Sequence, residues 1–257
     1  MKDIYLISSL GMSPGVVTGV IDSLQYEDLK KRYNPKYIAV ITTDNELTRL
    51  SLDVIEIDVQ KYNPHIDIIP YIMNGLSDII NEKDNERVMK TFVNAIKEGE
   101  RFRYRGEIDE IHVNIAGGRK TMSGVFTSLS NIFPVDKVYH LLTTTEMEQR
   151  GNIKNFLRSD GTIDKERINS DDLKVNLHPK VANAPSTLVE IPILHSFNFE
   201  RLLNLTKEIE KQQKISEYDL MKIMVREEFL IREDKNNFSF TDKGRLLFNL
   251  IKYYISK

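Results

Sequence analysis

Three runs of β-branched and aliphatic residues constrain the fold of this 257-residue chain more than any other feature. Each run is too continuous to leave one face wet, and each is followed by a polar turn and then by apolar residues at helical spacing. Buried strands that alternate with helices are typical of a parallel sheet covered on both faces. The runs are IYLISS (4–9), YIAVITT (37–43) and EIHVNIA (110–116).

Further segments extend this pattern over roughly the first 145 residues. HIDIIPYI (65–72) and KVYHLLT (137–143) are predicted strands, and residues 86–102 are predicted to form an amphipathic helix. We therefore predict an α/β fold, a Rossmann-like and mostly parallel sheet with helices on both faces.

The rest of the sequence predicts an insertion and a second domain. Periodicity fades at about 143–185, which we interpret as an irregular insertion, and a strand pattern returns at 186–194, so the first domain is expected to span 1–195. Residues 199–257 then predict a helix, a second helix with Ser216 at its N-cap, a hairpin and a closing helix. This order resembles a small winged-helix domain.

Composition excludes several classes of function. Lys and Arg number 36 against 38 Asp and Glu, a net charge of −2, so no global field attracts nucleic acid or an anionic membrane. No run approaches the roughly 20 apolar residues of a membrane span, and the β-like start is unlike a secretory signal, so we expect a cytoplasmic protein. The chain has no cysteine, and its 5 histidines lack metal-ligand spacing, so we expect no metal and no cofactor.

The loop after the third apolar run carries the strongest chemical signal. Gly117 and Gly118 are followed by Arg119, Lys120 and a predicted helix, an arrangement that presents backbone N–H groups and a positive helix end to an anion. It is not a P-loop, because Arg119 separates the glycines from Lys120 and Thr121. The alternative is a tight turn before a core stripe formed by Met122, Val125, Phe126, Leu129 and Ile132. Two cations at a helix N-terminus oppose the macrodipole, which favours an anion site.

Two other loops follow predicted parallel strands and are expected to converge on the same crevice. The segment LGMSPG (10–15) contains Ser13 before Pro14, which could equally be a helix N-cap with proline at the first helical position. Thr42, Thr43 and Asp44 end the second apolar run. Hydroxyl groups and one pair of cations, without histidine, cysteine or paired carboxylates, are typical of a site that binds phosphates.

At these loops the chain resembles a known family. SSLGMSPGVVT (8–18) together with NIAGGRKTMSG (114–124) looks like the CRISPR-associated Rossmann fold (CARF) proteins, and more narrowly the ring nucleases among them. The resemblance implies a homodimer that binds cyclic oligoadenylate, most often cyclic tetra-adenylate, a messenger of type III CRISPR defence. It further implies cleavage of the ring, without metal, to linear products that end in a 2′,3′-cyclic phosphate.

The resemblance also implies roles for individual residues. Lys120 matches the family's motif lysine and would stabilise the reacting phosphate, while Ser13 matches the loop serine that would orient the ribose or the phosphate. The ligand is expected to be bound by Ser9, Gly11, Met12, Thr42, Thr43, Asp44, Asn114, Gly117, Gly118, Arg119, Thr121 and Met122.

The sequence leaves three alternatives to a ring nuclease open. The first is a non-catalytic sensor of cyclic oligoadenylate that regulates transcription by binding DNA through its winged helix. Residues 199–257 do not favour it, since they carry 12 Lys and Arg against 10 Asp and Glu and show no clear recognition helix. The second is a ring-activated ribonuclease, although no histidine follows His195. The third is an unrelated α/β protein.

Overall fold

A six-stranded sheet forms the centre of the larger part of the chain. The computed structural model describes residues 1–26, 33–193, 199–210, 221, 224–225, 229–232 and 238–255. In spatial order the strands are β3, β2, β1, β4, β5 and β6; the first five are parallel and β6 is antiparallel to β5. Their bounds are β1 Lys2–Leu10, β2 Tyr33–Thr43, β3 Asp67–Met73, β4 Glu110–Asn114, β5 Lys137–Thr143 and β6 Ser186–Ile191.

Position in the sheet explains the apolar runs. β1 is the central strand, and Ile4 to Leu10 are all buried. β4 beside it is buried from Ile111 to Asn114. The outer strands β3 and β6 keep exposed residues. The predicted strands and the predicted mostly parallel sheet are confirmed, because only strands with helices on both faces need such continuous apolar sequence.

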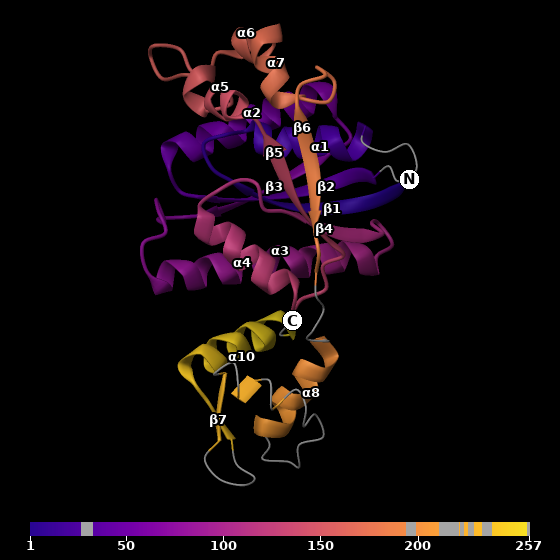
Figure 1. Ribbon diagram of the computed structural model, residues 1–257, viewed down its shortest axis with the longest axis vertical. Helices are drawn as coiled ribbons and strands as arrows, with labels where there is room; N and C mark the ends of the chain where they lie inside the picture. The colour runs from indigo at the N-terminus through magenta and orange to yellow at the C-terminus, as the bar shows by residue number, and fades with distance from the viewer. Residues whose placement is uncertain are drawn as a thin grey trace. The chain divides into compact units, whose positions relative to one another are not determined.

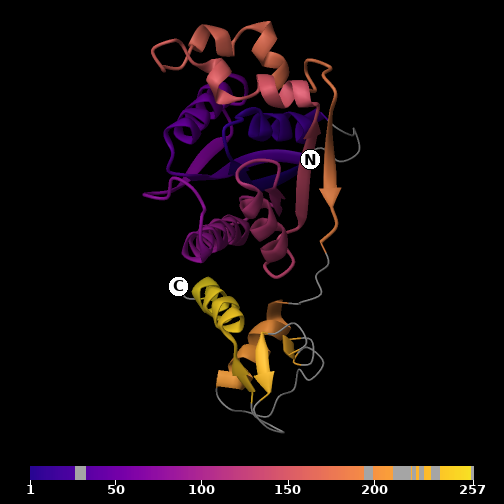
Figure 2. The same ribbon diagram turned by 60° about the vertical axis from the view of Figure 1, so that its left-hand side comes forward.

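Helices cover both faces of the sheet (Figure 1). Helices α1, Gly15–Tyr26, and α2, Glu46–Tyr62, pack on one face, where a continuous apolar cluster joins them to β1 and β2. Helices α3, Glu82–Tyr104, and α4, Lys120–Ser130, cover the other face, as Figure 2 shows from a second direction. Phe92 of α3 stacks on Phe126 of α4 with ring centroids 4.2 Å apart.

The helix predicted at 86–102 is confirmed and is longer at both ends. Its N-cap is Asn81, whose side chain accepts a hydrogen bond from the Asp84 N–H. Four residues of the stripe expected after Gly118, from Met122 to Leu129, are buried in α4. Ile132 lies beyond the helix end at Ser130 and belongs to the second unit described below.

Residues 143–185 are more regular than the expected irregular insertion. They contain α5 Thr145–Arg150, the 3₁₀ helix η1 Ile153–Phe156, α6 Lys165–Ile168 and α7 Asp171–Leu177. Each of these elements is at most 7 residues long, so it contributes only one or two apolar residues to a core. Helical periodicity needs a longer window to be visible, which is why the sequence did not reveal them.

A second compact unit consists of Asn131–Pro134 and Leu194–Lys257. Its described elements are α8 Phe199–Glu210, β7 Leu230–Arg232, β8 Phe238–Phe240 and α10 Asp242–Ile255. β7 and β8 form the predicted hairpin, with Leu230 opposite Phe240. The helix predicted to begin at Ser216 starts within residues 211–220, which lie outside the described ranges, and the described residues beyond them, Met221, Met224 and Val225, are helical. Leu205, Leu247 and Ile251 are among the buried residues of this unit's own core.

Candidate functional site

The strand order creates a crevice at the carboxyl ends of β1 and β4. Within the sheet, β2 and β4 lie on opposite sides of strand β1. The chain continues from β1 to β2 and from β4 to β5, so the loops after β1 and β4 lead away from each other. The two loops nevertheless touch at their glycines. A Cβ atom placed on Gly11 would lie only 3.3 Å from the Cα and the N of Gly118. Of the three loops predicted to share one crevice, those after β1 and β4 are therefore in direct contact.

The two glycines after β4 are required by this geometry. A Cβ atom on Gly117 would lie 2.2 Å from the carbonyl oxygen of Ser9, a distance no side chain tolerates. The Ser9 Oγ donates a hydrogen bond of 2.6 Å to the Gly117 carbonyl and closes the contact. Gly118 has φ of +76°, a left-handed conformation that disfavours any residue with a side chain. The pair therefore fixes the course of the loop.

A pocket of about 160 Å³ opens beside these glycines. Of the residues predicted to bind a ligand, it brings together Gly11, Met12, Thr43, Gly118, Arg119 and Met122. Its remaining lining residues, which the sequence did not reveal, are Leu10, Asn45, Leu47, Thr48 and Ser77. Asn45 and Thr48 form the capping box of α2, and Ser77 lies in the loop after β3. The rule that loops at strand carboxyl ends converge could have found all three.

The two adjacent cations differ in their surroundings. Arg119 Nη2 donates a hydrogen bond of 2.6 Å to Oδ2 of Asp78, a residue of the loop after β3. Lys120 is the first residue of α4, is exposed, and has no ion-pair partner among the described residues. The first turn of α4 contains no acidic residue. An unpaired cation thus stands at a positive helix end, an unfavourable arrangement that an anion would relieve.

Three residues predicted to bind the ligand lie beneath the loops instead. Ser9, Thr42 and Asn114 are completely buried. Thr42 Oγ1 donates to the Leu10 carbonyl at 3.1 Å. The Asn114 side chain donates to the Val16 carbonyl at 3.0 Å and accepts from the Ala116 N–H at 3.0 Å. These side chains hold the loops in place from within the protein.

The Asp44 carboxylate is engaged by its neighbours. It forms an ion pair with Arg49 at 2.7 Å and accepts a hydrogen bond of 2.7 Å from the Gly75 N–H. The hydrogen bond from Arg49, followed by that from Gly75, holds the pKa of Asp44 below its usual value. Asp44 is therefore an anchor between the loops after β2 and β3. Next to Lys120, Thr121 is exposed and Met122 is fully buried under Gly118.

Ser13 lies on the other side of the loop after β1. It lines a smaller cavity of about 40 Å³ with Thr143, Glu148 and other residues, and it does not line the larger pocket. Helix α1 begins at Gly15, and the Ser13 carbonyl accepts from the Val16 N–H at 3.2 Å. The Ser13 hydroxyl makes no hydrogen bond within the described part of the chain. The loop 11–14 thus separates two cavities, with Met12 facing one and Ser13 the other.

The helical segment 145–177 holds this loop in position. The Ile153 N–H donates to the Met12 carbonyl at 2.6 Å. A Cβ atom on Gly15 would lie 2.2 Å from the Asn176 carbonyl oxygen, so the start of α1 and the end of α7 are in close contact. On α1, Asp22 accepts hydrogen bonds from the backbone N–H groups of Lys180 and Val181, and burial raises its pKa.

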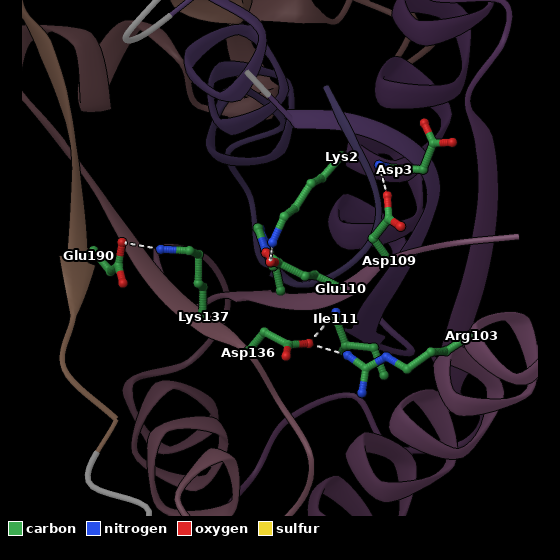
Figure 3. Close-up of polar contacts among 10 residues, drawn as sticks. Lys2, Asp3, Arg103, Asp109, Glu110, Ile111, Asp136, Lys137 and Glu190 are labelled. Atoms are coloured by element: carbon green, nitrogen blue, oxygen red, sulfur yellow. Dashed lines mark hydrogen bonds and ion pairs between the residues drawn. The ribbon is translucent and has the colours of Figure 1, made fainter. Parts of the chain in front are cut away.

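The opposite edge of the sheet is tied together by ion pairs (Figure 3). Lys2 of β1 pairs with Glu110 of β4, and Lys137 of β5 pairs with Glu190 of β6 at 2.7 Å. Asp136 accepts from the Ile111 N–H at 2.8 Å. His112, fully buried in β4, has its pKa lowered by burial to about 4. The Asp3 carboxylate pairs with Lys36 at 2.7 Å, a residue not drawn in Figure 3, so each charged side chain labelled there has a partner, in contrast to Lys120 at the carboxyl ends of the strands.

Neither a metal site nor a membrane span is evident in the described ranges. No three His, Asp or Glu side chains among them gather closely enough to hold an ion. No helix within those residues combines the length and the apolar character needed to cross a bilayer.

Comparison with known proteins identifies the family. The family model described as CRISPR-associated protein NE0113 matches residues 13–225, which is most of the chain. The chain belongs to this family. The CRISPR-associated part of the resemblance found in the sequence is thereby confirmed, and the narrower likeness to ring nucleases stays a prediction.

One solved structure supports the fold. Enterococcus italicus Csm6 bound to cyclic hexa-2′-fluoro-hexa-dAMP shares 14% identity at a TM-score of 0.50, and the match covers 88% of this chain and 49% of Csm6. This NE0113-family chain therefore spans about half the length of that relative. Protein VC1899 from Vibrio cholerae matches at 13% identity over 98% of this chain and 65% of its own, with a TM-score of only 0.33. No curated protein sequence matches the chain.

Proposed function

We propose that this protein is a ring nuclease of type III CRISPR defence that binds a cyclic oligoadenylate, with cyclic tetra-adenylate the first candidate, and cleaves it without a metal. Membership of a CRISPR-associated family supports this role. So does the similarity in fold to Csm6, whose structure holds a cyclic oligonucleotide. The observation that carries the proposal is the contact of Gly11 with Gly118 beside Lys120, which has no ion-pair partner in the part of the chain that the structure describes.

The proposed reaction needs no protein nucleophile. The 2′-hydroxyl of a ribose in the ring loses its proton to water as its oxygen attacks the adjacent phosphorus, the bond from phosphorus to the 5′-oxygen breaks, and the leaving oxygen takes up a proton from water. The product is linear, with a 2′,3′-cyclic phosphate at one end and a 5′-hydroxyl at the other. Alignment of the attacking and leaving oxygens can supply up to about 7–11 kcal/mol, and a well-placed charge donor about 3–4 kcal/mol.

Each loop has a part in this reaction. The exposed Gly118 lets a phosphate approach the main chain, because Gly11 and Gly118 carry no side chains there. Lys120 is assigned to the charge that develops on the phosphate, since Arg119 is already bonded to Asp78. Ser13, in the neighbouring cavity, is assigned to the ribose. A ring that reaches both cavities would extend across the loop 11–14.

We propose a homodimer as the binding unit. A ring with twofold symmetry fits an isologous dimer in which both copies present the same loops. Analytical ultracentrifugation tests this point: a chain that stays monomeric with saturating cyclic tetra-adenylate contradicts the shared site.

The activity is tested by incubating the pure protein with labelled cyclic tetra-adenylate and EDTA and separating the products. Lys120→Ala should slow cleavage about 10²- to 10³-fold, as expected for one preorganised donor. Ring affinity should fall less. Arg119→Ala should have the smaller effect on cleavage, because its charge is shared with Asp78.

Lys83→Ala is the matched control, because it removes a cation from the first turn of α3, which is also exposed. It should cleave at the wild-type rate. Equal slowing by Lys83→Ala would mean that only the general field matters and would contradict the assignment of Lys120. A wild-type protein that binds the ring and never cleaves it would overturn the catalytic proposal in favour of a sensor.

A further inference from the structure

The loop after β3, residues 74–81, closes one side of the larger pocket. Its first half is fixed to the neighbouring loop: Asp44 accepts from the Gly75 N–H at 2.7 Å, and the Asp44 N–H donates to the Leu76 carbonyl at 2.7 Å. Arg87 of α3 donates to the Asn74 carbonyl at 2.6 Å. Ser77 then lines the pocket. These hydrogen bonds hold the first half of the loop in place as one wall of the pocket.

The second half of the loop reaches the glycine loop through one charged contact. Asp78 Oδ2 accepts from Arg119 Nη2 at 2.6 Å, and Arg119 itself lines the pocket. The two side chains are 41% and 60% exposed, so the pair lies at the protein surface. It links the loop after β3 to the glycine loop, beside the pocket that Ser77 and Arg119 line.

We propose that Asp78 is a specificity-determining residue that competes with the anionic ligand for Arg119. In the ligand-free protein its carboxylate neutralises the Arg119 guanidinium. A phosphate that binds Arg119 must displace Asp78 or accept a carboxylate beside it. The ligand's identity as a cyclic oligoadenylate rests on the proposed function, whereas the competition concerns any phosphate that enters this pocket.

This competition selects for ligands with several phosphates. A single phosphate that takes Arg119 exchanges one anionic partner for another, so its net gain is small. A ring that contacts Lys120 and the exposed main chain of Gly118 at the same time gains further interactions with which to displace Asp78. An opposing charge that penalises the wrong ligand more than the right one is a general route to specificity. Asp78 would thus keep monophosphates out of the site.

Inorganic pyrophosphate is the probe, titrated at constant ionic strength and followed by the ¹⁵N-edited NMR signals of the arginine side chains. Asp78→Asn should tighten pyrophosphate binding roughly two- to five-fold, the range that one exposed ion pair corresponds to. Glu86→Gln is the matched control, because it removes the same charge from the exposed Glu86–Lys90 pair of α3. Its affinity for pyrophosphate should equal that of the wild type.

A double-mutant cycle with Arg119→Gln separates competition from a general effect of charge. If Asp78 acts through Arg119, Asp78→Asn has no effect on pyrophosphate affinity in the Arg119→Gln background. Unchanged or weaker binding by Asp78→Asn alone overturns the proposal, as does a gain that persists without Arg119. Absence of ring cleavage would sink the proposed function and leave this result standing, since the titration uses no ring.

Discussion

Replacing Gly117 with alanine should displace the loop on which the candidate site depends. The new Cβ atom would lie 2.2 Å from the Ser9 carbonyl oxygen and 2.8 Å from a methyl group of Val16. The first neighbour is main chain of the central strand and cannot rotate away. The glycine loop must therefore move, by roughly the difference between 2.2 Å and the shortest ordinary contact of about 3.0 Å.

The magnitude follows from this displacement. Overpacking in a well-packed region costs typically about 1–3 kcal/mol. The shift also weakens the hydrogen bond from Ser9 Oγ to the Gly117 carbonyl, which contributes about 0.5–1.5 kcal/mol. We expect a loss of roughly 2–4 kcal/mol in the free energy of unfolding. A catalytic loop misplaced by about 1 Å can lose 10²-fold in rate, so the proposed cleavage of the ring should fall by up to about that factor.

Gly124→Ala provides the matched control. Gly124 lies in α4, and a Cβ atom placed there has no neighbour within 4 Å. Alanine in a helix interior should stabilise the protein by about 0.5–1 kcal/mol and leave cleavage unchanged. Urea unfolding followed by far-ultraviolet circular dichroism is suitable, since the chain has no tryptophan. If Gly117→Ala unfolds and cleaves like the wild type, the close contact between β1 and the glycine loop is not what holds the site.

Two further predictions concern buried polar groups. Burial lowers the pKa of His112 from 6.5 to about 4, so at mildly acidic pH the unfolded chain binds a proton that the folded protein does not. The free energy of unfolding should therefore fall by about 2 kcal/mol between pH 7.5 and pH 5. Denaturation curves for His112→Gln should show a correspondingly flatter pH dependence. Asn114→Ala should lower the free energy of unfolding, measured with urea, by about 2–3 kcal/mol, because the Val16 carbonyl and the Ala116 N–H lose their hydrogen-bond partner. An unchanged midpoint of urea unfolding would contradict the role of Asn114 in supporting the loops.

The sequence by itself determined the sheet and the position of the glycine loop. Continuous apolar runs such as residues 4–9 and 110–116 can be buried on both faces only in a covered parallel sheet, so their pattern alone predicted β1 and β4. The glycines also carry local information, because a left-handed φ at Gly118 is a property of that residue. These features depend on neighbours along the chain.

Only the tertiary structure decided which of the predicted polar residues line the pocket. Ser9, Thr42 and Asn114 belong to the same short polar segments as Gly11, Thr43 and Gly118, yet they are completely buried and do not line the pocket. A strand turns successive side chains to opposite faces, and the crossing of loops above determines which of them is covered. Sequence spacing contains no record of what covers a residue.

The same reason applies to charge. Arg119 and Lys120 are adjacent in the sequence and have similar chemistry. Within the described ranges only Arg119 meets a carboxylate, that of Asp78, which comes from a loop 41 residues earlier in the chain. The short helices η1, α6 and α7 likewise share an apolar core with α2, a helix about 100 residues earlier in the chain. Interactions between distant segments form when the sheet brings them together, so no pattern within either segment could have specified them.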